Sequence, residues 1–210
     1  MMRILLVDDH EIVRRGLKQL LAEEFPKAVF GEATRVPQAR ELIVQKAWDL
    51  VLLDINLPGG SGLDLLTDVK RLCPEPAVLV LSSYPEEEFA VRAFKLGSAG
   101  YLTKASVVDE MLTAVKKVLA GGKYVSAVLA EKLATALGNP QTQALHETLS
   151  PRELEVLRLV ATGKTIKEIA AGFSLSEKTI ATYRTRISEK LGLSTNVELA
   201  RYALQHRLVE

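Results

Sequence analysis

Short apolar runs alternate with longer amphipathic stretches along the first 120 residues of the chain. Five of the runs are apolar almost throughout, and they predict strands at 3–7, 28–33, 50–53, 77–81 and 100–102. Between them the apolar positions recur with helical spacing. The first such stretch is expected to place on one face Ile12, Val13, Leu17, Leu20 and Leu21. The last is expected to do the same with Val108, Met111, Leu112, Val115, Val118 and Leu119.

Apolar strands that are separated by single helices predict a parallel sheet with helices on both faces. Five strand–helix units in about 120 residues have the size of a flavodoxin-like, doubly wound domain with a five-stranded parallel sheet. Because the strands are parallel, their carboxyl ends share one edge of the sheet, and the right-handed crossovers place the helices on its faces. We expect the functional crevice at that edge.

The pattern changes after residue 122, where the strand signals stop. A short helix near 127–137 leads into "GNPQTQALHET", whose glycine, asparagine and proline indicate a linker. From Ser150 onward the pattern predicts only helices, near 151–161, 166–172, 177–191 and 195–206. "SPRE" and "TIKE" have the form of capping boxes, Ser176 is a further N-cap, and the middle two helices have helix-turn-helix spacing. We therefore expect an α/β domain at 1–122, a short helix and linker at 123–147, and a small all-α four-helix domain at 148–210.

Composition narrows the class of protein. No apolar run approaches the roughly 18 residues of a membrane span, and the N-terminus lacks the form of a signal peptide. The lone Cys73 excludes an intrachain disulfide and a cysteine zinc cluster, so we expect a cytoplasmic protein without a membrane partner. Residues 1–122 carry 15 basic and 17 acidic side chains, whereas residues 123–210 carry 12 and 9. Any polyanionic partner is therefore expected at the C-terminal part.

Chemically distinctive residues follow the predicted strands at the carboxyl edge. Asp8 and Asp9 follow the first strand, Asp54 the third, and Ser82 and Lys104 the fourth and fifth. Each acid alone is ambiguous, because Asp often caps turns and helices. Three carboxylates converging on one pocket would require a cation, and their hard oxygens suit Mg²⁺. A neighbouring lysine and hydroxyl would hold the other oxygens of a phosphoryl group carried by a carboxylate nucleophile. His10 we interpret as an ordinary helix-start residue.

The segments "ILLVDDH", "VLLDINLPGGSGLDLL", "VLVLSS" and "GSAGYLTK" resemble the receiver domain of two-component response regulators, over residues 2–120. The resemblance implies that Asp54 accepts a phosphoryl group from a sensor histidine kinase. It implies Mg²⁺ ligation by Asp9, Asp54 and the main-chain carbonyl of Asn56, with Asp8 assisting through water. The remaining implied roles are the switch hydroxyl, the switch aromatic and the phosphate-pairing lysine, which fall to Ser82, Tyr101 and Lys104. Ser82 stands where relatives often have threonine, and the hydroxyl is retained.

The helix expected at 177–191 combines an apolar stripe with small polar and basic residues on its other faces. Small side chains can approach base edges while basic ones bind phosphates, so such a helix suits a major groove. An ordinary amphipathic surface helix has the same composition. The segment from "LSPRELEVL" to "SEKLGL" resembles the LuxR-type helix-turn-helix of the NarL/FixJ subfamily, over residues 149–205. This implies that 177–191 is a recognition helix for double-stranded DNA. Its expected contacts, as a group, are Lys178, Thr179, Thr182, Tyr183, Thr185, Arg186 and Lys190. Ala181 and Arg184 depart from the residues common in relatives, which leaves the individual base contacts open.

The two resemblances together predict a transcription regulator whose chemistry is limited to its own phosphorylation and dephosphorylation, and which is therefore not an enzyme. Phosphorylation is expected to draw Tyr101 inward, to change the surface of the fourth and fifth helices and fifth strand, and to promote a homodimer on paired half-sites. RNA polymerase is a further partner compatible with this role. Two alternatives stay open. A phosphatase with an aspartyl-phosphate intermediate often has a second acid where Asn56 stands, and a constitutive dimerisation module would not respond to phosphorylation.

Overall fold

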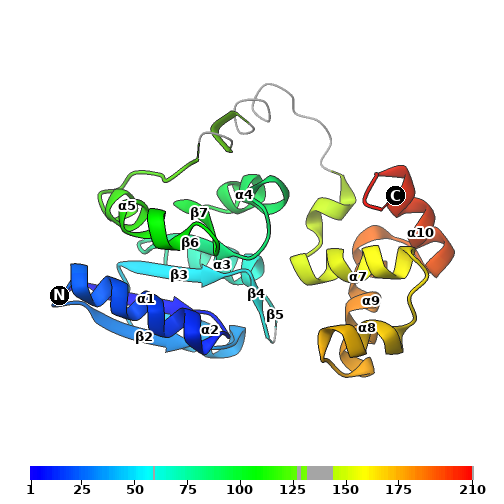
Figure 1. Cartoon of the computed structure of the whole chain (residues 1–210), viewed down its shortest axis with the longest axis horizontal. Helices are drawn as coiled ribbons and strands as arrows, with labels where there is room; N and C mark the ends of the chain where they lie inside the picture. The colour runs from blue at the N-terminus through cyan, green and yellow to red at the C-terminus, as the bar shows by residue number, and fades with distance from the viewer. Residues whose placement is uncertain (59, 127–128, 132–143, 210) are drawn as a thin grey trace. The chain divides into compact units, whose positions relative to one another are not determined.

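The structure is a computed structural model that describes residues 1–58, 60–126, 129–131 and 144–209 (Figure 1). The chain divides into two compact units, residues 1–140 and 141–210. The helix expected near 127–137 falls largely outside the described residues. Within the described part, no helix is both long enough and apolar enough to cross a bilayer.

The first unit is built on a five-stranded parallel sheet. Its strands are β1 (Arg3–Val7), β2 (Val29–Ala33), β3 (Leu50–Asp54), β6 (Ala77–Ser82) and β7 (Gly100–Thr103). Their order in the sheet is β2-β1-β3-β6-β7. The connecting helices are α1 (Glu11–Glu24), α2 (Val36–Gln45), α3 (Gly62–Leu72), α4 (Glu86–Lys95) and α5 (Val107–Leu119). The flavodoxin-like prediction is confirmed, and each strand lies where the sequence predicts it, with ends shifted by at most one residue.

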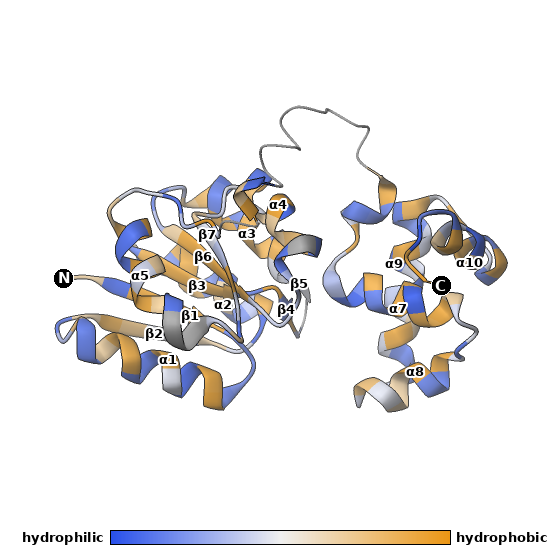
Figure 2. Ribbon diagram, turned by 45° about the horizontal axis from the view of Figure 1, so that its top comes forward, coloured by the Kyte–Doolittle hydropathy of each residue, from blue (hydrophilic) through white to orange (hydrophobic). Residues whose placement is uncertain are grey.

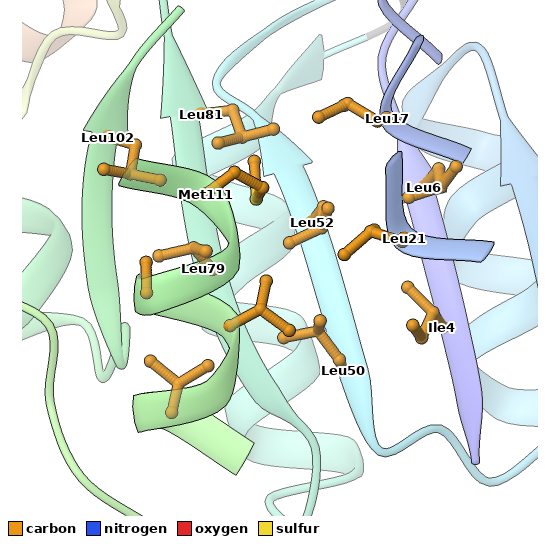
Figure 3. Packing of buried hydrophobic residues seen from close by; sticks show 13 residues of the cluster. Ile4, Leu6, Leu17, Leu21, Leu50, Leu52, Leu79, Leu81, Leu102 and Met111 are labelled. Atoms are coloured by element: carbon orange, nitrogen blue, oxygen red, sulfur yellow. The ribbon is translucent and has the colours of Figure 1, made fainter. Parts of the chain in front are cut away.

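The core lies on both faces of this sheet, because the strands are apolar along their length (Figure 2). On one face, Leu52 and Leu79 belong to a cluster with Leu21 of α1 and Met111 of α5 (Figure 3). Alternate strand residues such as Val51 are equally buried and point to the opposite face.

The prediction for α1 was wrong at one position. Ile12 is 87% exposed, whereas Leu17 and Leu21 are buried as expected. The first turn of α1 lies at the carboxyl edge of the sheet, beyond the strands that would cover it. An apolar side chain is therefore left on the surface beside the expected crevice.

The order of the strands places a topological switch point between β1 and β3. From β1 the chain moves outward to β2 and then returns to the other side as β3. Val7 pairs in register with Leu53, so the next residues, Asp8 and Asp54, end neighbouring strands. Open α/β sheets bind their ligands in the crevice that this reversal of direction creates.

The turn after β3 contains a short antiparallel pair that the sequence did not predict, β4 (Asn56–Leu57) and β5 (Gly60–Ser61). It delivers the chain directly into α3, whose first residue is Gly62 and whose N-cap is Ser61. A Cβ at Gly62 would lie 2.2 Å from the main-chain oxygen of Asp54. The close approach of α3 to the end of β3 therefore requires glycine.

The elements that the structure describes in the second unit are all helices. It contains a short 3-10 helix η1 (Leu145–Thr148), followed by α7 (Pro151–Ala161), α8 (Ile166–Phe173), α9 (Glu177–Leu191) and α10 (Asn196–Gln205). The expected capping boxes at Ser150 and Thr165 and the N-cap at Ser176 are present, and Thr195 with Glu198 forms a third box. Helix α9 packs on α7 and α8, and α10 packs on α7.

The end of the segment interpreted as a linker is ordered against this unit. The main-chain N–H of His146, in η1, donates to the Tyr202 hydroxyl of α10 at 3.1 Å. The rings of His146, Tyr202 and His206 are in mutual contact, with centroids 4.2 to 5.9 Å apart. A single 3-10 turn has too few residues to produce a periodic pattern, so polar composition alone suggested a linker.

Candidate functional site

The carboxylates expected at the sheet edge do converge. Asp8, Asp9 and Asp54, together with His10, offer ligand atoms that all lie within 4.8 Å of one another. Asp8 and Asp54 are almost fully buried, each with 2% of its surface exposed. Like charges at such separations repel strongly when water is excluded. The pocket must therefore contain compensating positive charge.

Lys104 supplies part of that charge. Its Nζ lies 2.7 Å from Oδ2 of Asp8 and 2.7 Å from Oδ2 of Asp54. The loop after β7 carries it there, because the main-chain N–H of Lys104 donates to the Ser82 carbonyl at 2.7 Å. Burial lowers the pKa of Lys104, but the two carboxylates outweigh that effect and the pKa is raised. The ammonium therefore remains charged across the physiological range of pH.

Asp54 is held in the pocket with a defined orientation. Its Oδ1 accepts the main-chain N–H of Asn56 at 2.9 Å, while its Oδ2 faces Lys104. Burial raises the pKa of the Asp54 carboxyl above its ordinary value, against the opposing charge of Lys104 and the Asn56 N–H, and Asp8 adds to the rise. More positive charge in the pocket would favour the ionised, nucleophilic form.

His10 stands at the start of α1, as the sequence predicts, and its side chain also contacts two acids. His10 is the N-cap of α1, and its side chain makes no capping bond. Its Nδ1 lies 2.9 Å from Oδ1 of Asp8 and 2.9 Å from Oδ1 of Asp9. The direct succession of two acids and an imidazole was the available signal. Arg14, one helical turn later, donates to the Asp8 main-chain carbonyl at 2.9 Å and was not anticipated.

Ser82 and Tyr101 lie on the neighbouring strands. Ser82 is fully buried, and its Oγ accepts the main-chain N–H of Tyr84 at 3.0 Å. Tyr101 is also fully buried, and its hydroxyl donates to the Tyr84 carbonyl at 3.1 Å. Both side chains thus contact the loop between β6 and α4. Tyr101 already occupies the inward position in this structure.

The residues of the pocket fit a divalent cation. Three carboxylates face a single ammonium, which leaves a net negative charge, and the donors are mainly hard oxygens. Such a donor set favours Mg²⁺, which keeps waters and phosphate oxygens among its ligands, over softer metals. The His10 nitrogen is the one donor of a different kind in the group.

Helix α9 presents most of the expected DNA-contacting residues to solvent. Ile180, Ile187 and Leu191 form its buried stripe, as predicted. The exposed side chains on its outer surface include Lys178, Ala181, Thr182, Thr185 and Arg186, and Thr179 and Tyr183 are half-buried. The hydroxyls of Thr182 and Thr185 donate to carbonyls one turn earlier, at 2.9 and 3.1 Å.

Two basic residues of α9 are engaged within the unit. Lys190 Nζ lies 2.6 Å from Oε2 of Glu153, which is buried at the start of α7. Arg184 donates to the Asn196 side chain at 3.0 Å and to the Ser194 carbonyl at 2.9 Å, which ties α9 to the turn before α10. Polar partners outside α9 thus account for an arginine where relatives often have an apolar residue. The structure favours a role for Lys190 in holding α9 on α7.

Comparisons with known proteins identify the family of each of the two domains. Residues 4–116 match the family described as the response regulator receiver domain, and residues 147–203 match the bacterial regulatory proteins of the luxR family. The response regulator GacA of Pseudomonas aeruginosa is 35% identical over 211 residues, covering 100% of this chain and 99% of GacA. The response regulator UvrY of Escherichia coli is 32% identical over 209 residues, covering 99% of this chain and 96% of UvrY.

Solved structures give the same result. RcsB from Salmonella enterica serovar Typhimurium, bound to promoter P1flhDC in the presence of a phosphomimetic, is 25% identical with a TM-score of 0.59, covering 96% of this chain and 97% of that one. A LuxR-family response regulator from Aurantimonas is 32% identical with a TM-score of 0.58, covering 65% of this chain and 98% of that one. The chain therefore belongs to the DNA-binding two-component response regulators of the NarL/FixJ subfamily, with a receiver domain and a LuxR-type helix-turn-helix domain.

Proposed function

We propose that Asp54 is the phosphoacceptor and that its phosphorylation by a histidine kinase, with Mg²⁺, controls dimerisation and DNA binding. The observation that carries the proposal is the buried Asp54 carboxylate, 2.7 Å from the Lys104 ammonium and beside a second buried acid, Asp8. An Asp54 oxygen would attack phosphorus while the bond from phosphorus to the donor's histidine nitrogen breaks. Nothing in this step requires a further acid or base at Asn56, which fits a chain that modifies itself rather than an external ester.

The cation would be held by Asp9, Asp54 and the Asn56 carbonyl, with Asp8 assisting through water. When bound, Mg²⁺ supplies positive charge for the phosphoryl oxygens. Lys104, which already bridges Asp8 and Asp54, would follow the transferred oxygens, and the Ser82 hydroxyl would bind another. Preorganised positive charge of this kind is the main source of catalysis in phosphoryl transfer.

Two exposed apolar features support the proposed protein partners. Ile12, at the rim of the acidic pocket, is 87% exposed, which suits a docking contact for the kinase. On α10, Val197 is 78% exposed and Leu204 is 54% exposed. They are seven residues apart and so lie on one face of the helix, which suits a two-fold contact between copies of the chain.

The exposed face of α9 supports the proposed DNA interface. Lys178 and Arg186 would bind phosphates, and Thr182 and Thr185, with hydroxyls turned toward their own backbone, would present methyl groups to base edges. Thr179 and Tyr183 would complete the contact. Two copies related by two-fold symmetry would bind inverted half-sites.

One experiment on the full chain tests the proposal. The wild type and Asp54→Asn are treated with labelled acetyl phosphate and Mg²⁺, and bound sequences are then selected from random DNA with and without the donor. We expect label and donor-enhanced selection of paired half-sites in the wild type alone. Equal labelling of Asp54→Asn would overturn the site. Multiple turnovers of a phosphate ester would favour the phosphatase, and donor-independent dimers with unchanged DNA affinity would favour constitutive dimerisation.

A further inference from the structure

The residues that follow α5 extend the edge of the receiver sheet. Tyr124 forms a parallel bridge with Gly100, the first residue of β7, and its main-chain N–H donates to the Ala99 carbonyl at 2.8 Å. The preceding Lys123 donates to the Ser98 carbonyl at 3.2 Å and lies 5.4 Å from the centroid of the Phe94 ring of α4. This segment, residues 123–126, leads toward the DNA-binding unit. Residues 123–126 are therefore still bound to the receiver domain at the point where the chain continues toward the DNA-binding unit.

Two side-chain bonds fasten the segment to different helices. The Tyr124 hydroxyl donates to Oε2 of Glu110 on α5 at 2.7 Å. The Ser126 hydroxyl donates to Oε2 of Glu86, the first residue of α4. Both are bonds from a hydroxyl to a carboxylate, but only the second reaches the start of α4, directly after the loop between β6 and α4.

Ser126 also caps the helical residues 129–131. Its Oγ accepts the main-chain N–H of Leu129 at 3.1 Å, and its carbonyl accepts that of Ala130 at 3.0 Å. Leu129 is fully buried. With its proton donated to Glu86, the Ser126 oxygen is oriented to cap the turn that continues the chain.

Glu86 stands at the end of the loop that Ser82 begins. The Ser82 hydroxyl holds the Tyr84 N–H at 3.0 Å, and the Tyr84 carbonyl holds the Tyr101 hydroxyl at 3.1 Å. A shift of the Ser82 hydroxyl toward a phosphoryl group would release the Tyr84 N–H. Since Glu86 is only two residues further on, a rearrangement of the loop is expected to move its carboxylate.

We propose that the Glu86–Ser126 hydrogen bond relays the state of the phosphoacceptor pocket to the segment that leads to the DNA-binding unit. The proposal rests on the proposed function of Asp54. In this structure the bond to Glu86 orients the Ser126 hydroxyl, whose oxygen accepts the Leu129 N–H. Movement of the loop between β6 and α4 would remove the acceptor from Ser126 and loosen that cap. Glu86 and Ser126 are positioning residues, since neither contacts the phosphoacceptor.

The test is the coupling ratio, defined as the DNA affinity of the full chain with acetyl phosphate and Mg²⁺ divided by that without them. Ser126→Ala and Glu86→Ala should lower this ratio by about threefold or more, the size of effect expected for residues in a coupling network. Ser126→Thr, which retains the hydroxyl, should restore it. Tyr124→Phe is the matched control, because it removes the bond of the same segment to α5 and should retain the ratio.

Labelling of Asp54 is measured in every variant and should be unchanged, which separates the relay from phosphorylation itself. A wild-type ratio of one would overturn the proposed function and the relay with it. A wild-type ratio above one that Ser126→Ala and Glu86→Ala leave unchanged would overturn the relay alone. The relay is also wrong if Tyr124→Phe lowers the ratio as much as they do.

Discussion

The receiver and the helix-turn-helix unit place their charged residues in opposite environments. In the receiver, Asp8 and Asp54 are buried at the ends of neighbouring strands and share one ammonium. In the helical unit, Lys178 and Arg186 project from an exposed surface of α9. Buried charges are costly and need partners, so their positions are strongly constrained. Exposed charges on a helix cost little free energy, because water solvates them. Many different arrangements of charged residues on α9 would therefore be compatible with the same fold.

The comparison shows which kind of site a fold can specify by itself. A parallel sheet brings the strand ends to one edge, so five separate sequence positions define one pocket in the receiver. The exposed surface of a helix determines which side chains face solvent, but it does not determine which of them a partner contacts. The ion pair of the buried Glu153 with Lys190, in the helical unit, is an exception. It holds two helices together much as Lys104 holds two strand ends.

The largest effect of a substitution is expected in the buried pocket of the receiver. Lys104→Ala removes the ammonium 2.7 Å from Asp54, and labelling by acetyl phosphate should slow by about a hundredfold, as for loss of one preorganised donor. The initial rate of labelling measures this. Lys116→Ala, which removes an exposed lysine paired with Glu24, should label like the wild type. A rate for Lys104→Ala within a few-fold of the wild type would contradict the assigned role.

Loss of the Glu153–Lys190 ion pair in the helical unit should have an intermediate effect, on stability and not on phosphorylation. Glu153→Ala removes the partner of Lys190 and half of the capping box at Ser150, and should destabilise this unit by about 2 kcal/mol. Circular dichroism follows the unfolding of the helices. The single tryptophan, Trp48, lies in the receiver unit, so the transition seen by its fluorescence should stay in place. A shift of the fluorescence transition instead would place the effect in the wrong unit.

The smallest effect is expected from titration of the ring cluster at the end of the helical unit. Burial lowers the pKa of His146, and the nearby His206 and Arg158 lower it further against Glu147. The unfolded chain then binds the proton more readily than the folded one, so the stability contribution is present above about pH 6.5 and is lost as pH falls below that value through the lowered pKa of the folded state. The helical unit should melt a few degrees lower at about pH 5.5 than at about pH 7.5.

His146→Phe is the control for this pH dependence. It keeps an aromatic ring against Tyr202 and removes the titrating group, so its melting temperature should depend less on pH than that of the wild type. The same dependence in both proteins would mean that other groups are responsible.

The receiver fold and most of its pocket could be predicted because the strands are short, apolar and followed by their functional residues. The contact of His10 with both acids could also have been inferred from their succession in the sequence. Three features could not. Ile12 has the spacing of a core residue but lies past the sheet edge, the bridging position of Lys104 depends on two strands folding side by side, and Tyr101 is placed by the loop that holds its hydroxyl.

The helical unit illustrates a different limit. Its helix boundaries could be predicted from the caps, since Ser150, Thr165 and Ser176 act locally. The partner of Lys190 could not, because Glu153 is 37 residues away in the sequence and no periodicity connects them. The individual DNA contacts of α9 stay a prediction for the same reason: the partner that selects among its exposed residues is outside the chain.

The start of α3 lies close to the end of β3, and this closeness determines which positions around the phosphoacceptor can be substituted without a change in structure. Asp54→Asn retains the size and shape of the side chain, although it loses the negative charge and one of the two oxygens that accept from Asn56 and Lys104. Gly62 has no such substitute, since any Cβ would fall 2.2 Å from the Asp54 main-chain oxygen and would push the strand end or the helix aside. Gly62, which has no side chain, therefore tolerates substitution as poorly as Asp54, whose carboxylate performs the chemistry.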